Sequence, residues 1–196
     1  MPCAMMHLMC AKNYNNTSDT AFYIGSVAPD CISDRYEKDK NHLRDQKENR
    51  EVKLIETAKR LDTCDPYILG VILHLFTDMK WDNGRMKEHR DNYTGESWFH
   101  DYRFQISLIS SYMFHHNDWA PGLWDEMCAI DASVYSKLPD LAPDRIHEYL
   151  KRNRIWHIQN DIGPSEAFPC DIVDSFCRET ANEFREWLCL NGIKTE

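Results

Sequence analysis

The chain has 196 residues, with 23 Lys and Arg against 32 Asp and Glu and a formal net charge of −9. That length suits a single domain with a sizeable core, and 42% hydrophobic residues with six Trp argue against an intrinsically disordered chain. Only seven of the 196 residues are Gly. This share is about half the usual ~7%, which disfavours a glycine-rich phosphate loop or a tightly turning β-barrel. Because an acidic chain does not attract nucleic acid or anionic lipid overall, an anionic substrate requires a local cationic centre such as a bound metal.

Neither a targeting signal nor a transmembrane segment is predicted. The apolar start, residues 1–13, lacks a basic leading region and is interrupted by His7. The longest apolar run, residues 67–73, is far shorter than the ~18 residues of a membrane span. The eight Cys are scattered and form no CxxC pair. We therefore expect reduced, packed thiols in a cytoplasmic protein.

The helical signals, taken in chain order, predict an all-α fold. Residues 34–51 are strongly charged and are interpreted as a solvated loop or an exposed helix face. Apolar residues at helical spacing predict a helix near 51–62, and Asp65-Pro66 opens a second helix that Gly84 ends. A long helix is expected over 97–116, and further helices start near Pro121, Pro143 and Pro169. We predict one domain, 1–196, of six to eight helices.

The most informative segment for chemistry is the helix that carries His74, Asp78 and Asp82. Residues four apart lie one above the other on a helix, so these three side chains share a face. Their neighbours are apolar nearly all round, which predicts a buried helix whose polar side chains need partners. A His–Asp hydrogen bond in a core and a metal site explain this pattern equally well.

Three further residues carry side chains of the same kind. His7 lies in an apolar N-terminal segment, Asp30 follows Pro29 in a turn after an aromatic run, and His42 stands within the charged stretch. Each has an ordinary explanation by itself: a core histidine, a turn or cap residue, and a surface residue.

Taken together, these residues resemble the zinc-dependent phospholipase C family, which includes the catalytic domain of glycosylphosphatidylinositol phospholipase D. Its wider superfamily includes the single-strand-specific zinc nucleases. The resemblance covers about residues 2–105, and residues 118–196 match only in being helical. The pattern that carries it is His7, Gly-x-x-x-Pro-Asp30, His42 and Tyr-x-x-Gly-x-x-x-His74-x-x-x-Asp78-x-x-Trp81.

The resemblance implies an all-α bundle with up to three zinc ions at the bottom of a cleft. By position, one zinc would be bound by the residues Asp30, His42, His74 and Asp78. Asp78 would bridge to a second zinc that also takes His7. The free N-terminal amine completes the second site in the family; here removal of Met1 would leave Pro2 to supply it.

The third site of the family matches this chain poorly. The phospholipase D relatives have His directly after the Trp of the helix, and this chain has Asp82 there. The nearest further ligands are Glu96, His100 and Asp101, of which Glu96 and His100 are spaced to share a helix face. We therefore take Asp82 and His100 as the candidate ligands of a third metal.

Imidazole and carboxylate ligands without thiolate suit Zn²⁺ in a catalytic site. The predicted activity is hydrolysis of phosphoric esters by a metal-activated water that attacks a phosphodiester, with Asp30 as ligand and general base. The substrate would be a small-molecule or lipid phosphodiester.

Two alternatives remain open. One is a phosphodiesterase or nuclease that acts on nucleotides or single-stranded nucleic acid. The other is a non-catalytic helical protein that is stabilised by its metal. A histidine–aspartate phosphohydrolase ranks lower, because its HD dipeptide occurs only at His100-Asp101.

Overall fold

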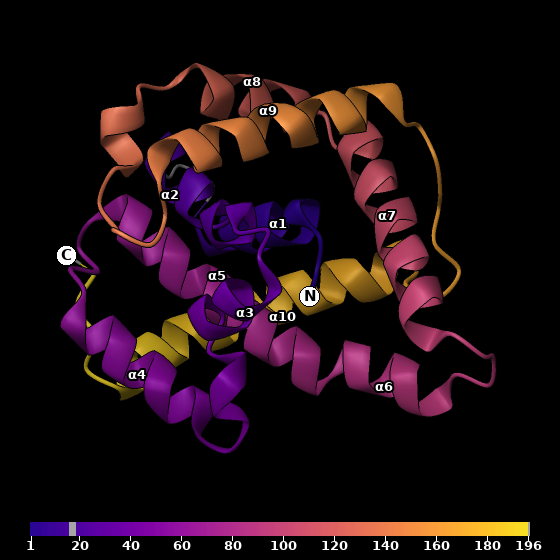
Figure 1. The fold of residues 1–196 in the computed structure, drawn as a ribbon, viewed down its shortest axis with the longest axis horizontal. Helices are drawn as coiled ribbons and strands as arrows, with labels where there is room; N and C mark the ends of the chain where they lie inside the picture. The colour runs from indigo at the N-terminus through magenta and orange to yellow at the C-terminus, as the bar shows by residue number, and fades with distance from the viewer. Residues whose placement is uncertain (16–18, 196) are drawn as a thin grey trace.

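The structure is a computed structural model that describes residues 1–15 and 19–195, and of residues 46–48 it describes the backbone only. The described chain is helical and contains no β-strand, which confirms the predicted all-α class (Figure 1). The α-helices are α1 (Ala4–Tyr14), α2 (Thr20–Gly25), α3 (Arg35–Asn41), α4 (Arg50–Arg60), α5 (Pro66–Asn83), α6 (Arg85–Asn92), α7 (Trp98–His116), α8 (Trp119–Ala129), α9 (Pro143–Gln159) and α10 (Cys170–Leu190). Three 3₁₀ turns join them: η1 (Ala28–Cys31), η2 (Arg44–Asn49) and η3 (Ala132–Tyr135).

Helix α5 begins and ends where its sequence predicts. The Asp65 side chain accepts a hydrogen bond from the backbone N–H of Ile68, Pro66 takes the first helical position, and Gly84 follows the last residue. Because this helix is apolar on almost every side, it is buried from Tyr67 to Met79. It therefore forms the centre of the bundle.

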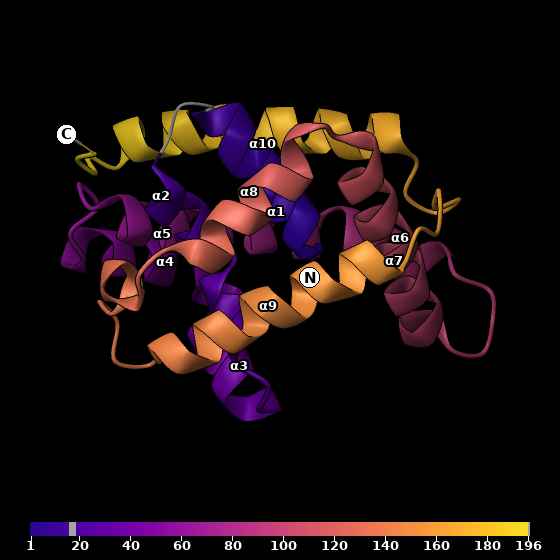
Figure 2. The ribbon, with the colours of Figure 1, turned by 90° about the horizontal axis from the view of Figure 1, so that it is seen from above.

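A second buried helix, α1, lies beside α5 and packs along α10, which covers one face of the bundle (Figure 2). Helices α8 and α9 run along the opposite face, and α7 closes one end (Figures 1 and 2). The N-terminus lies near the middle of the molecule in both views. The start of the chain is thus an interior element.

Helices α2 and α5 cross with their backbones in direct contact, and two glycines permit it. A Cβ atom at Gly25 would lie 2.0 Å from the carbonyl oxygen of Tyr67, and one at Gly70 would lie 2.2 Å from that of Phe22. No side chain fits at either position, since real Cβ contacts are essentially never below 3.0 Å. This crossing brings the end of α2, and η1 after it, against the middle of α5.

Two predictions from the sequence need correction. The described residues form more helices than six to eight. Helices α1 and α2 are apolar on most sides and α6 is almost entirely polar, so these three lack an amphipathic period that would reveal them. Helix α8 begins at Trp119, so Pro121 lies inside its first turn, where a missing backbone N–H costs nothing.

The eight cysteines are free thiols, as the sequence predicts, and Cys3, Cys10, Cys31 and Cys177 are buried. Among the described residues, no helix has both the length and the apolar character needed to cross a bilayer.

Candidate metal centre

Five of the predicted ligands meet in one buried cluster near the crossing of α2 and α5. His42 Nε2 lies 3.1 Å from His74 Nε2, 3.5 Å from Asp30 Oδ1 and 3.7 Å from Asp78 Oδ2. His74 Nε2 lies 3.9 Å from the same Asp78 oxygen. The two imidazole rings and the Asp78 side chain are fully buried. We call His7, Asp30, His42, His74 and Asp78 the ligand cluster.

The backbone fixes which nitrogen of each imidazole carries the proton. His74 Nδ1 lies 2.8 Å from the carbonyl oxygen of Ser26, and His42 Nδ1 lies 2.7 Å from that of Lys38. A carbonyl oxygen only accepts, so each ring has its N–H at Nδ1 and turns Nε2 toward the cluster. The two Nε2 atoms therefore face each other, 3.1 Å apart.

His7 adds a third imidazole on the other side of Asp78. Its ring stacks on that of His74 with centroids 3.9 Å apart, and its Nε2 lies 3.5 Å from Asp78 Oδ1. Neither ring nitrogen of His7 makes a hydrogen bond within the described part of the chain. Asp78 thus turns one oxygen toward His42 and His74 and the other toward His7, as a bridging carboxylate does.

These donor atoms satisfy the spatial requirement for binding a cation. The residues fall into two groups, His42–His74–Asp78 and His7–Asp30–His74, and within each group one ligand atom per residue lies within 4.8 Å of the others. Tetrahedral zinc with bonds of ~2.0–2.1 Å separates two nitrogen ligands by roughly 3.3 Å, and the two Nε2 atoms are 3.1 Å apart. The donor set fits zinc without thiolate ligands.

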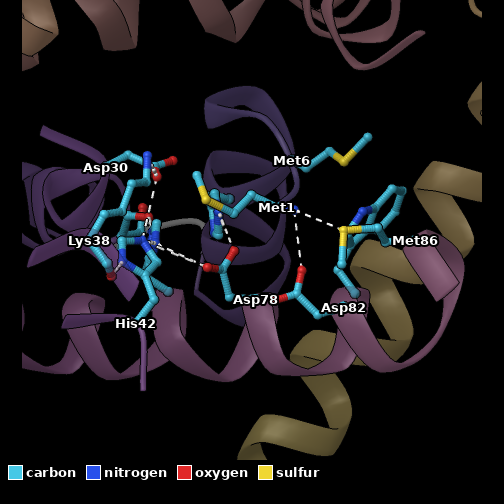
Figure 3. Close-up of polar contacts among 12 residues, drawn as sticks. Met1, Met6, Asp30, Lys38, His42, Asp78, Asp82 and Met86 are labelled. Atoms are coloured by element: carbon cyan, nitrogen blue, oxygen red, sulfur yellow. Dashed lines mark hydrogen bonds and ion pairs between the residues drawn. The ribbon is translucent and has the colours of Figure 1, made fainter. Parts of the chain in front are cut away.

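Two basic side chains cover the carboxylates of the cluster. Lys38 Nζ lies 2.8 Å from Asp30 Oδ1, and Arg44 Nη2 lies 2.7 Å from Asp78 Oδ2. Figure 3 shows Lys38 beside Asp30, on the opposite side of His42 from Asp78 and Asp82. The sequence does not predict either basic residue at the site, because the charged stretch that contains them is expected to be solvated.

The electrostatics of the cluster keep its carboxylates ionised and His74 neutral. Burial would raise the pKa of Asp30, but the contacts with His42 and Lys38 outweigh it and hold that pKa well below its usual range. Burial would likewise raise the pKa of Asp78, but contacts with the three histidines and with Arg44 outweigh it and lower that pKa well below its usual value. Burial, with His7 close by, lowers the pKa of His74 well below its usual value. These are the protonation states that metal ligands require.

The backbone of Leu43 adopts a left-handed conformation, and the side chains of the residues before and after it both reach the cluster. Leu43 has φ 56° and ψ 28°, which is uncommon for a residue with a branched side chain. It separates His42, at the end of α3, from Arg44, at the start of η2, and both point into the cluster. Such backbone strain often accompanies functional sites.

Asp82 lies one turn beyond Asp78 and pairs with cations. Its Oδ2 lies 3.0 Å from Arg44 Nε and 2.9 Å from Arg50 Nη1, and its Oδ1 lies 3.2 Å from the N-terminal amine of Met1 (Figure 3). The hydroxyl of Tyr102 donates to the Met1 carbonyl and holds this end of the chain in place. The N-terminal amine therefore lies next to the cluster.

His100 lies outside both groups of ligand atoms, on the exposed part of α7. The spacing of Glu96 and His100 predicts a shared helix face, but Glu96 precedes the first residue of α7 and is exposed. Helix α6 packs against this end of α7 through Asp101 and Tyr102, and His100 is left exposed. Of the predicted ligands, Asp82 and His100 therefore lie outside both groups, Asp82 beside the cluster and His100 on the exposed part of α7.

Comparisons with family models, with curated proteins and with solved structures give no match to this chain. The resemblance to zinc-dependent phospholipases C therefore depends on the residues named above.

Proposed function

We propose that the chain is a zinc-dependent hydrolase of phosphoric esters, with the ligand cluster as its active site. One observation carries this proposal: the Nε2 atoms of two imidazoles and the oxygens of two carboxylates converge in one buried site. Polar groups gathered in a protein interior are costly to desolvate, and a divalent cation bound among them offsets that cost. A structural His–Asp hydrogen bond would instead direct an N–H from a ring to a carboxylate.

The chain's own residues define what the site does. Asp30, His42, His74 and Asp78 would hold one zinc, and Asp78 with His7 a second. Zinc bound by imidazole and carboxylate polarises phosphoryl oxygens and activates water at neutral pH. Of the two carboxylates in the cluster, Asp30 is the more exposed, and its lowered pKa suits it to orient the attacking water as a hydrogen-bond acceptor.

The charge balance favours an anionic substrate. Asp30, Asp78 and Asp82 contact Lys38, Arg44, Arg50 and the N-terminal amine, so three negative groups meet four positive ones. Each zinc would add two more positive charges. A chain with a net charge of −9 would thus present a local cationic centre, which phosphate esters require.

The test is hydrolysis by the zinc-loaded protein of three substrates: a bis-aryl phosphate, a chromogenic phosphocholine ester and a single-stranded oligonucleotide. We expect zinc-dependent cleavage of at least one ester, loss of that activity in His74→Ala and full activity in His100→Ala. The second variant is the matched control, because it removes a histidine outside the cluster.

The outcome also separates the competing functions. Cleavage of the oligonucleotide alone would assign the chain to the nucleases. If the zinc-loaded protein cleaves none of the three and His74→Ala only lowers the melting temperature, the cluster is a stabilising metal site and the proposal is wrong.

A further inference from the structure

We propose that Lys38 and Arg44 form an anion clamp that grips the phosphoryl group of the substrate once a divalent cation occupies the ligand cluster. This inference rests on the proposed function and assigns substrate binding to two residues that are not metal ligands. It makes phosphate binding conditional on the metal.

The clamp residues lie between the cluster and solvent. Their side chains are 23% (Lys38) and 19% (Arg44) exposed, whereas that of Asp30 is 7% exposed and that of Asp78 is fully buried. Lys38 comes from α3, which has no buried residue, and Arg44 comes from the start of η2. An anion that approaches the cluster from this side meets the two cations first.

Each clamp residue is paired with an oxygen that a metal would need. Lys38 neutralises Asp30 Oδ1, and Arg44 neutralises Asp78 Oδ2. A divalent cation bound to these oxygens repels both side chains and takes over their role as counter-charge. The ammonium and the guanidinium then lack a partner, and an anion that also touches the metal supplies one.

The two side chains suit different parts of this task. Arg44 also binds Asp82 through Nε, so it keeps one anchor when Asp78 turns to the metal. Its planar guanidinium offers further N–H groups in the geometry that phosphate oxygens accept. Lys38 forms an ion pair with Asp30, and its flexible stem allows it to follow the substrate.

The experiment measures binding of zinc and then of inorganic phosphate to the full chain by calorimetry. The variants are Lys38→Met, Lys38→Arg and Arg44→Gln. The matched control is Lys40→Met, because Lys40 is exposed on the same helix and the substitution removes the same charge. We expect phosphate to bind the zinc form of the wild type and not the metal-free form.

Lys38→Met should weaken phosphate binding about tenfold or more, since a charge-assisted hydrogen bond is lost. The same variant should bind zinc as tightly as the wild type or more tightly, because a competing cation is gone. Lys38→Arg should restore phosphate binding, and Lys40→Met should change neither affinity. A purely structural role for Lys38 would not separate the two affinities in this way.

Two results would overturn the clamp. If zinc binds and phosphate affinity is unchanged in Lys38→Met and in Arg44→Gln, the clamp is wrong while the metal site stands. If zinc does not bind the wild type, the proposed function fails and the clamp fails with it. Should Arg44→Gln not fold, Lys38→Met alone decides, since its side chain is partly exposed.

Discussion

Substituting Gly70 by Ala tests how the fold builds the cluster. A methyl group there would lie 2.2 Å from the carbonyl oxygen of Phe22 and 2.8 Å from the backbone nitrogen of Ser26, and both are backbone atoms. Ordinary contact begins at 3.4 Å, so α2 and α5 must separate by about 1.2 Å, the difference from 2.2 Å. Overpacking of this kind costs about 3 kcal/mol or more, because two buried helices must move rather than one side chain.

Gly122→Ala is the matched control, since nothing lies within 4 Å of a Cβ atom at this position in α8. There the same substitution should stabilise the protein by ~0.5–1 kcal/mol, because Ala loses less backbone entropy in a helix. At ~2–4 °C per kcal/mol for a chain of this size, we expect the melting temperature to fall by ~6–12 °C for Gly70→Ala and to rise by ~1–4 °C for the control.

The assay is thermal unfolding followed by circular dichroism, with zinc titration of each folded variant. Gly70→Ala should also weaken zinc binding, because the Ser26 carbonyl that orients His74 belongs to the displaced segment. A melting temperature for Gly70→Ala within 2 °C of the wild type would refute the backbone contact between α2 and α5.

Three further predictions concern single side chains. His42→Gln should abolish the rise in melting temperature that zinc produces, measured by differential scanning calorimetry, because one of the two facing Nε2 atoms is removed. Burial lowers the pKa of His157 to about 4. Below pH ~6.5 the unfolded chain therefore gains a proton at this residue that the folded chain does not accept. Urea unfolding should show a loss of about 3 kcal/mol of stability between pH 6.5 and 4, and a smaller loss in His157→Gln. The exposed thiols of Cys64 and Cys189 should react at once with a thiol reagent, as measured by mass spectrometry. Cys177 should react only when the protein unfolds, because burial raises the pKa of its thiol well above 9.0.

Local signals account for the parts of the fold that the sequence predicts well. Asp65-Pro66 and Gly84 bound α5 because caps act within a few residues of a helix end. The helix is also apolar all round, which places it at the centre of the bundle. Helices α1, α2 and α6 lack an amphipathic period, so the sequence does not predict them.

The site could be predicted only in part for the same physical reason. Spacing along one helix puts His74 and Asp78 on a shared face, and the resemblance adds His7, Asp30 and His42. Lys38 and Arg44 are inconspicuous in a charged stretch, because nothing local shows which charges turn inward. For Arg44, the inward turn follows a residue, Leu43, in a left-handed conformation that sequence pattern does not predict for leucine.

The most direct test of the central claim is anomalous X-ray scattering at the zinc edge from crystals grown without chelator. We predict one ion between His42 Nε2 and His74 Nε2 and a second between Asp78 Oδ1 and His7. A cluster without an anomalous peak in the presence of zinc, or zinc found only at exposed histidines such as His100, would contradict the account.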